Sequence, residues 1–481
     1  MALLAVAALI AAAGCGGQTS TNGAMGDSAK AVPAGALAYV DVNTDRDSDA
    51  WQTLTSLGEK FPAYAEASKS FQRDLGRSSG TCDTNLSDLQ DVLGADAGAA
   101  ITSVDAAGGG TPNWVVYVAS NDDGKVKDAV ESCKDTVKAG SYDSYTLYSD
   151  GKDGHLAVGD NVLLLANSAD NLHQSIDLLA GKGDSLADDA GFATAANEFP
   201  DGSVLNGYVD TQRIARLMSL AALTGAPQAD AAQLRQSLKW LSTVKTLTFS
   251  VTPSDSGIHV SSSMTATSAD DLPGPHRGGL SDRLPADTFA FLSASDLGDN
   301  LGPLLAAAET PVGGGPEAQL MRDVVALTNG DLLFYLRPGL PVSGALLLRP
   351  DDPARGMQTL SKLLRMNLPD AGLHAQGNRI PVAPGINVSW KRVGDVIVVS
   401  NDPAAGTVPD QTLADTQSYQ DFLKAAGAPS DASVVLYVDV PAILGMAPTS
   451  VDANLKHLGG IAAWTSTEGT TVTSDLFVQV K

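Results

Sequence analysis

Cysteine and positive charge are scarce in this chain of 481 residues. Its 31 lysines and arginines face 55 aspartates and glutamates, which gives a net charge of −24. Such a charge repels nucleic-acid phosphates and anionic lipid surfaces, and no basic run or aromatic-basic stripe argues otherwise. With 43% hydrophobic and 18% charged residues, the composition indicates a globular protein that does not bind nucleic acid.

Long apolar runs are also missing, apart from one at the start of the chain. Ala2–Ala13 is too short to span a bilayer, which takes about 20 residues, but it has the length of the apolar part of a signal peptide. Small residues precede Cys15, and this resembles the lipobox of bacterial lipoproteins, in which the cysteine is diacylated. The alternative is a buried N-terminal helix, which fits poorly with the Gly-, Ser- and Thr-rich stretch that follows.

The N-terminal pattern therefore predicts three successive segments. Residues 1–14 are a lipoprotein signal peptide, Cys15 is the lipidation site, and residues 15–30 are a flexible tether. The expected location is the extracytoplasmic face of the cell membrane, with the N-terminal lipid as the contact to the membrane.

Acylation of Cys15 leaves two cysteines, Cys82 and Cys133. Export places them in an oxidising compartment, which favours a disulfide between them. Cys133 lies on the apolar face of a helix predicted over Val126–Val137, whereas Cys82 lies in a polar loop. A bridge that closes about 50 residues would stabilise the fold by roughly 3–4 kcal/mol through the entropy of the unfolded chain. The alternative is two unpaired buried thiols.

Five segments of the first half recur in the same order in the second half, at separations of about 230 to 250 residues. Collinear agreement of this kind indicates two diverged copies of one unit, with loops that differ in length. The matched segments are Val32–Val40 with Leu284–Leu292, Trp114–Val118 with Ser343–Leu347, Val158–Leu164 with Val393–Val399, Leu186–Asp188 with Leu413–Asp415, and Gly207–Asp210 with Leu436–Asp439.

Strands joined by tight turns and interleaved with helices predict an α+β fold, in which each unit is a largely antiparallel sheet packed with helices. The expected boundaries are residues 31–267 for repeat unit 1, 268–283 for a Pro- and Gly-rich linker, and 284–481 for repeat unit 2. The strands expected in unit 1 are Leu37–Val42, Ala99–Ser103, Trp114–Ala119, Tyr145–Tyr148, His155–Val158, Val162–Ala166, Val204–Val209, Thr246–Thr252 and Ile258–Thr265.

The first copy also carries a recognisable set of motifs: the opening Val32–Asp41, the hairpin Val158–Leu163, the Leu-Ala-Asp-Asp segment at Leu186 and the strand Gly207–Asp210. Together they resemble a bacterial envelope family catalogued as domain of unknown function (DUF) 3352, whose actinobacterial members are lipoproteins. The resemblance implies no established activity, ligand or catalytic residue. The second copy has Leu292-Ser293-Ala294 where the first has Val40-Asp41-Val42, so a role of Asp41 is not expected in both copies.

Two acidic patterns invite a functional interpretation. Asp45, Asp47 and Asp49 alternate like the start of a calcium loop, but the sixth and twelfth positions, Ala50 and Ser56, are not the glycine and glutamate that such a loop needs. We therefore predict a solvated acidic turn that caps a helix.

The aspartates that follow Val209 and Val438 recur in both halves of the chain. Each lies between a strand and a helix, and Pro441 stands just inside the second helix. Capping of a helix N-terminus is the expected role of both aspartates.

Motifs of nucleophilic and metal chemistry are incomplete. The Ser-x-x-Lys spacing occurs at Ser149 and Ser242, but the Ser-Asp-Asn and Lys-Thr-Gly elements that accompany it in serine enzymes are missing. The six histidines are scattered, and none pairs at the spacing of metal ligands. The sequence predicts no catalytic, metal or cofactor site.

Three functions follow in order of preference. The first is a non-catalytic membrane-anchored envelope lipoprotein that presents a binding or scaffold surface, with an envelope protein as a conceivable partner. The second is a carrier that holds an apolar or lipid ligand in a cavity, and the third is a hydrolase without a recognisable motif.

Overall fold

The chain folds into two compact units, residues 1–271 and 272–481. The computed structural model describes residues 26–66, 69–70, 92–104, 112–134, 136–151, 154–225, 241–269, 272, 279–295, 323–339, 341–367, 376–430, 432–446 and 452–481. Both units combine helices with antiparallel strands, so the predicted α+β class is confirmed. The boundary between the units falls inside the predicted linker, 268–283.

The first unit is built on one antiparallel sheet. Along this sheet the strands lie in the order β10, β9, β8, β1, β2, β3, β7, β6, β5, β4, so that β1 is central although it comes first in the chain. The strands are β1 (Ala38–Asn43), β2 (Leu93–Ser103), β3 (Asn113–Ser120), β4 (Val137–Tyr142), β5 (Tyr145–Ser149), β6 (His155–Gly159), β7 (Val162–Ala166), β8 (Leu205–Asp210), β9 (Val244–Ser254) and β10 (Gly257–Ala266).

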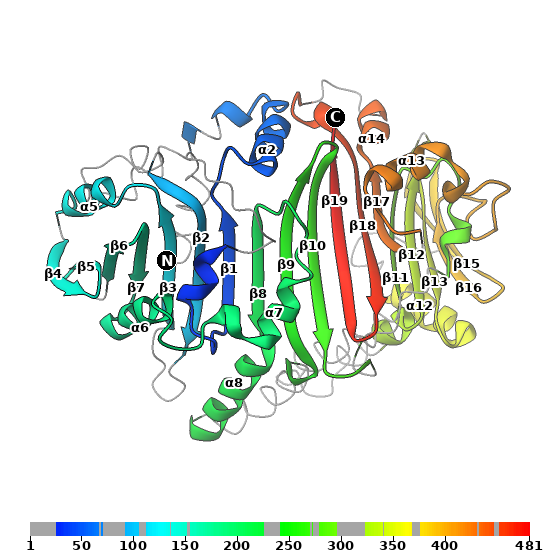
Figure 1. Cartoon of the computed structure of the whole chain (residues 1–481). Helices are drawn as coiled ribbons and strands as arrows, with labels where there is room; N and C mark the ends of the chain where they lie inside the picture. The colour runs from blue at the N-terminus through cyan, green and yellow to red at the C-terminus, as the bar shows by residue number, and fades with distance from the viewer. Residues whose placement is uncertain are drawn as a thin grey trace. The chain divides into compact units, whose positions relative to one another are not determined.

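Helices cover the sheet of this unit, and Figure 1 shows η1, α6 and α7 in front of its strands. Buried aromatic and aliphatic side chains from β1, β2 and β8 pack against η1, η2 and α7. The helical elements are η1 (Asp27–Ala31), α2 (Asp49–Glu59), α5 (Asp123–Glu131), α6 (Ala169–Leu179), η2 (Leu186–Asp188), α7 (Ala190–Ala196) and α8 (Thr211–Gly225).

The second unit also rests on an antiparallel sheet, with the strand order β19, β18, β17, β11, β12, β13, β16, β15, β14. Its strands are β11 (Ala290–Ser295), β12 (Asp331–Arg337), β13 (Ser343–Arg349), β14 (Arg379–Ala383), β15 (Ile386–Val393), β16 (Val396–Ser400), β17 (Ser433–Asp439), β18 (Leu458–Glu468) and β19 (Thr471–Val480). Its helical elements are η4 (Ser281–Arg283), α12 (Pro353–Asn367), η5 (Leu413–Asp415), α13 (Gln417–Ala425), α14 (Val440–Met446) and η6 (Leu455–His457).

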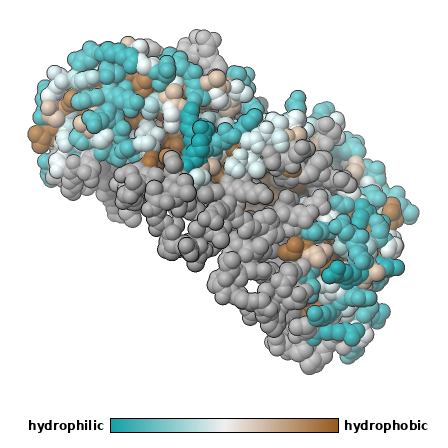
Figure 2. All heavy atoms as spheres, turned by 90° about the horizontal axis from the view of Figure 1, so that it is seen from below, coloured by the Kyte–Doolittle hydropathy of each residue, from teal (hydrophilic) through white to brown (hydrophobic). Residues whose placement is uncertain are grey.

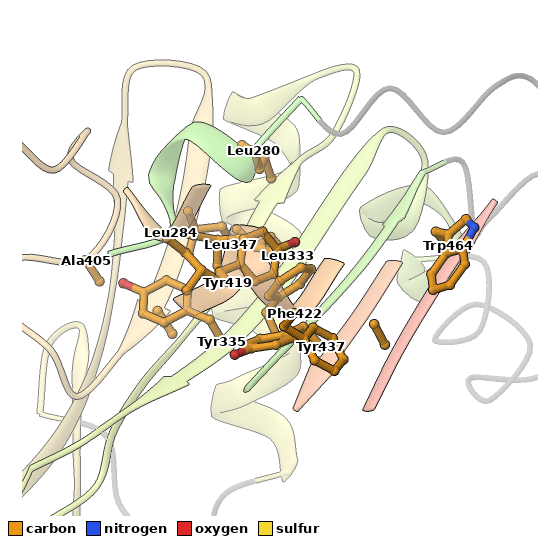
Figure 3. Packing of buried hydrophobic residues seen from close by; sticks show 14 of the residues in the cluster. Leu280, Leu284, Leu333, Tyr335, Leu347, Ala405, Tyr419, Phe422, Tyr437 and Trp464 are labelled. Atoms are coloured by element: carbon orange, nitrogen blue, oxygen red, sulfur yellow. The ribbon is translucent and has the colours of Figure 1, made fainter. Parts of the chain in front are cut away.

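Two cores lie on opposite faces of the second sheet. The larger one packs aromatic residues of α13, among them Tyr419, against Tyr335 and Tyr437 of the strands (Figure 3). The smaller one surrounds Trp390 of β15, which is covered by α12. Side chains of successive strand residues point to opposite faces, so the same strands contribute residues to both cores.

The β6–β7 hairpin confirms the predicted Gly159-Asp160-Asn161 turn. Asp160 and Asn161 both adopt positive φ angles, 52° and 60°. Two left-handed residues are what a type I′ turn needs, and Asp and Asn tolerate this conformation better than most residues.

The structure corrects the helix expected over Val126–Val137. Helix α5 ends at Glu131, with Ser132 as its C-cap, and Val137 begins the edge strand β4. Val137 is 66% exposed, so it does not continue the buried face formed by Val126 and Val130. Where the helical periodicity predicted that the helix continues, β4 instead forms a hairpin with β5, and Asp143 in its turn has a positive φ.

Two predicted connecting segments are shorter than expected. The tether was expected to reach Lys30, but Asp27–Ala31 forms η1, in which Ser28 and Ala29 are buried. The linker was expected to reach Arg283, but Leu280 is buried in the larger core of the second unit.

Polar residues dominate the described part of the face shown in Figure 2. Described residues seen in Figure 2 are largely hydrophilic, with separate hydrophobic residues between them. Within the described ranges, we find no helix with the length and apolar character needed to cross a membrane.

Candidate functional site

Two carboxyl groups lie beside each other in the first unit, one of them buried and the other partly buried. Asp41 on β1 is 5% exposed and stands directly opposite Asn206 of β8. Asp96 on β2 stands opposite Asn43, two residues along the strand from Asp41. Because residues two apart share a face of the sheet, Asp41 and Asp96 become diagonal neighbours on the same face.

Ser28 of η1 contacts both carboxyl groups. Its backbone N–H donates to Asp96 Oδ2 at 2.7 Å, and its Oγ lies 3.0 Å from Asp96 Oδ1 and 3.1 Å from Asp41 Oδ1. The hydroxyl of Tyr39 lies 2.6 Å from Ser28 Oγ and 3.2 Å from Asp41 Oδ1. Asn206 faces Asp41 from β8, and the two carboxyl groups lie close enough for the charge of Asp41 to act on Asp96. We call Ser28, Tyr39, Asp41 and Asp96 the carboxyl cluster.

Gly98 of β2 allows η1 to pack closely against the sheet. A Cβ atom at this position would lie 2.6 Å from Ser28 Cβ, which real contacts essentially never reach. A hydrogen in place of a side chain therefore lets η1 approach the sheet closely enough for Ser28 to reach both carboxyl groups.

Burial dominates the electrostatics of the cluster. It raises the pKa of Asp41, and it raises the pKa of Asp96 well above its usual range, where the charge of Asp41 adds to the effect. Burial also raises the pKa of Tyr39, and the two nearby carboxyl groups raise it further. Desolvation disfavours a charged carboxylate, so the arrangement favours a neutral carboxyl group at one of the two positions.

The cluster can hold a proton, but it cannot easily meet a substrate. A general acid or base must lie within hydrogen-bond reach of the reacting group. Ser28, Tyr39 and Asp41 are 0%, 1% and 5% exposed, and their polar atoms bond to one another. Asp96 is partly buried, and both of its carboxyl oxygens bond to Ser28. The geometry therefore assigns these residues to holding η1 against the sheet.

Sequence reasoning missed Asp96, although it noticed Asp41. The strand was expected from Ala99, whereas β2 begins at Leu93 and includes Asp96. The available signal was a single charged residue within the small-residue run Gly94–Ala100. A charge inside a run that is otherwise apolar or small indicates a paired, buried group.

Two arginines line surface pockets of the second unit. Arg337 donates to Asp287 at 2.8 Å and to Asp402 at 3.0 Å, beside a pocket of about 330 Å3. Arg349 lines a second pocket, of about 520 Å3, where it contacts Asp331 and Asp395 at 3.2 and 2.9 Å. Each guanidinium charge is already compensated by two carboxylates, so neither pocket presents an uncompensated arginine to an anionic ligand.

The predicted capping aspartates are confirmed. Asp210 accepts from the backbone N–H of Arg213 at 2.8 Å, at the start of α8. Asp439 accepts from the N–H of Ala442 at 3.0 Å, at the start of α14. The capping predicted for the Asp45–Asp49 turn is wrong: Asp45 accepts from the N–H of Asp47 within the turn, and α2 begins after Ser48, an N-cap without a side-chain cap hydrogen bond.

The structure places few of the residues from the incomplete metal and nucleophile motifs. In the described part of the chain, no group of three His, Cys, Asp or Glu residues has the arrangement of a metal site. Ser149 ends β5, and Lys152 lies outside the described residues. His173 stacks on Tyr142, with ring centroids 4.1 Å apart, while His276 and His374 lie outside the described residues.

Two of the three cysteines, Cys15 and Cys82, lie outside the described residues, so the lipidation site and the disulfide stay predictions. Cys133 follows the C-cap of α5 and is half-buried, with its Sγ 3.5 Å from the carbonyl oxygen of Ala129. It does not lie on the helix face that was expected to direct it toward the core.

Thiol titration of the denatured, unreduced protein tests the predicted bridge. We expect that Cys82 and Cys133 give no reactive thiol before reduction and two after it, because the predicted export would expose them to an oxidising compartment. A Cys82→Ser variant is the matched control, since it leaves Cys133 as a single reactive thiol. Two reactive groups in the unreduced wild type would contradict the bridge.

Comparison with known proteins gives one family match. The chain matches the family described as "Protein of unknown function (DUF3352)" over residues 1–366, which confirms the resemblance seen in the motifs. No curated protein matches. Crystal forms I, III and IV of TP0453 are similar at 8–9% identity over 50–51% of this chain and 80% of theirs, with a TM-score of 0.28. A likeness at that level supports no argument about fold or function.

Proposed function

Since the chain belongs to the DUF3352 family of proteins of unknown function, we propose that it is a non-catalytic lipoprotein, held by an acyl chain on Cys15 at the outer face of the cell membrane. In this proposal the two folded units present binding or scaffold surfaces in the envelope.

The order of features at the N-terminus carries this proposal. An apolar run of signal-peptide length precedes Cys15, and a short polar stretch separates Cys15 from η1. Ser28 of η1 is fixed to the sheet through Asp41 and Asp96. The twelve residues Cys15–Gly26 can extend over at most about 40 Å. A lipid on Cys15 would thus keep the first unit close to the bilayer.

The chemistry of the described polar groups supports a role without catalysis. The most strongly perturbed carboxyl groups are enclosed with Ser28 and Tyr39, and Arg337 and Arg349 are each paired with two carboxylates. Paired and enclosed groups of this kind stabilise a fold.

We also propose that the two units are diverged copies of one ancestral unit. The strand orders support this, because β10-β9-β8-β1-β2-β3 in the first unit corresponds to β19-β18-β17-β11-β12-β13 in the second. The next strand in the sheet is β7 in the first unit and β16 in the second. β7 pairs with β3 and with β6, and β16 pairs in the same way with β13 and with β15.

Matched side-chain contacts support the same conclusion. Asn167 Oδ1 accepts from the N–H of Trp114 at 3.0 Å, and Asn401 Oδ1 accepts from the N–H of Gly344 at 2.8 Å. A capping box, formed by a hydroxyl residue and an aspartate three residues later, opens η2 at Ser185 and η5 at Thr412. By strand register Trp114 corresponds to Gly344, one residue along from the sequence match with Ser343. By the same register Asn167 corresponds to Asn401. Independent origin would not be expected to reproduce such contacts at corresponding positions.

Substitution of Cys15 tests the membrane anchor. We expect that Cys15→Ser moves nearly all of the protein from the membrane fraction to the soluble extracytoplasmic fraction, because the serine hydroxyl cannot form the thioether that carries the lipid. The measurement is immunoblotting of fractionated cells, together with mass spectrometry of the mature N-terminus. A Ser20→Ala variant, which changes the same polar stretch without touching the cysteine, is the control. Membrane retention of Cys15→Ser would overturn the anchor.

A further inference from the structure

We infer that Asp41 and Asp96 share one proton, and that this proton fastens the segment Gly26–Ala31 to the sheet of the first unit, so that a rise in pH weakens this attachment. The inference rests on the contacts of the carboxyl cluster and does not depend on the lipid anchor.

The carboxyl cluster has too few hydrogen atoms for its contacts when both carboxyl groups are ionised. Ser28 Oγ lies within 3.1 Å of three oxygens, on Tyr39, Asp41 and Asp96. The Ser28 hydroxyl can donate to only one of them, and the Tyr39 hydroxyl supplies one further hydrogen. When both carboxyl groups are ionised, these two hydrogens must serve four oxygen–oxygen contacts of 3.2 Å or less. One carboxyl proton supplies the missing donor.

The surroundings of the pair favour keeping that proton. Asn206, which faces Asp41 from β8, carries no charge, and Tyr39 is neutral. The other titratable groups that face the pair are Tyr117 on β3, whose pKa the charge of Asp96 helps to raise, and Asp27 on η1. Asp27 pairs with Lys30 at 2.7 Å in a mostly exposed ion pair. A second negative charge within the cluster would therefore be poorly compensated.

The direction of the pH effect follows from proton linkage. When the segment leaves, water reaches Asp41 and Asp96, and their pKa values return toward the ordinary value of 3.8. Above that pH the released state has lost the proton that the fastened state still holds. Release becomes easier by up to about tenfold for each pH unit, until the fastened pair also ionises. The fastened state is thus most stable in acid and weakens as the pH rises through the raised pKa of the pair.

Release would change the reach of the N-terminal anchor. The six residues Gly26–Ala31 would add roughly 20 Å of extended chain between the membrane and the first unit. This consequence alone rests on the proposed function. A failed Cys15→Ser test removes it and leaves the proton-dependent attachment intact.

Hydrogen exchange of the full-length protein, read by mass spectrometry between pH 5 and pH 9, tests the attachment. Protection factors of peptides covering Ser28–Ala31, corrected for the intrinsic pH dependence of exchange, should fall with rising pH in the wild type. In Asp96→Asn the amide supplies a permanent donor to Asp41, so protection should vary less than about twofold over the same range. Asp27→Asn, which neutralises the exposed acid of the same segment, should keep the wild-type pH dependence.

Two further variants keep the test decisive. Should Asp96→Asn not fold, Asp41→Asn replaces it with the same expected loss of pH dependence. In Gly98→Ala the new methyl group meets Ser28, so protection of the segment should be low at every pH, whereas Gly35→Ala adds a methyl group in open space and should leave it unchanged. Wild-type protection that does not vary with pH would overturn the inference, as would an Asn variant that keeps the full pH dependence.

Discussion

Replacing Phe192 by alanine is expected to lower the free energy of unfolding of the first unit by about 3–5 kcal/mol, because the change removes a fully buried aromatic ring. Phe192 of α7 is 0% exposed. Its ring meets Tyr39 edge-on at 5.5 Å and Tyr208 at 5.0 Å, so it joins the helix to β1 and β8. The resulting cavity cannot collapse fully, because the rings around it are fixed on neighbouring strands.

Denaturant unfolding followed by circular dichroism, with hydrogen exchange to assign each transition to a unit, measures this effect. Tyr64→Ala is the matched control, since that ring is 37% exposed and its loss should change the stability by less than about 1 kcal/mol. A Phe192→Ala protein as stable as the control would show that α7 does not hold the sheet.

The duplication proposal extends this expectation to the second unit. There Tyr419 of α13 meets Tyr437 edge-on at 4.9 Å and lies 6.4 Å from Phe291. Tyr419→Ala should therefore destabilise the second unit to a degree similar to the effect of Phe192→Ala on the first. A difference of several kcal/mol between them would count against equivalent packing.

Replacing Trp390 by alanine is expected to cost the second unit about 3–5 kcal/mol. Trp390 of β15 is 1% exposed and fills the core under α12, and its Nε1–H donates to Ser361 Oγ at 2.9 Å. The substitution removes both the largest side chain of that core and the hydrogen bond that ties the helix to the strand.

Two companion variants separate packing from hydrogen bonding at Trp390. Ser361→Ala leaves the indole N–H without its partner and should cost about 1–3 kcal/mol. Val408→Ala, at a site that is 60% exposed, is the control and should change the stability by less than about 0.5 kcal/mol. Unfolding of the second unit is measured by circular dichroism, because the substitution also alters tryptophan fluorescence. Equal losses in Trp390→Ala and Ser361→Ala would contradict the expected contribution of ring packing.

Much of the strand content was predictable from local patterns. The segments Tyr145–Tyr148, His155–Val158 and Val162–Ala166 coincide with β5, β6 and β7 to within one residue. Alternating side chains and the Asp-Asn turn are sufficient there, because hairpins depend on residues close in sequence. The caps at Asp210 and Asp439 were predictable for the same reason.

Errors occurred where pairing with a distant strand outweighed the local pattern. Residues 132–137 continue an apolar helical periodicity, yet Val137 pairs with Ser149 and begins β4. The run Gly94–Ala97 carries little β-propensity, yet it belongs to β2 because it pairs with β1 on one side and β3 on the other.

By itself the sequence determined the α+β class, the family and the short-range turns and caps, because these depend on periodicity and on residues a few positions apart. Only the tertiary structure decided that Asp96 meets Asp41 under Ser28. That cluster joins residues up to 68 positions apart, and its existence depends on strand register and on the missing side chain at Gly98. Register is a collective property of a whole sheet, so no local pattern contains it.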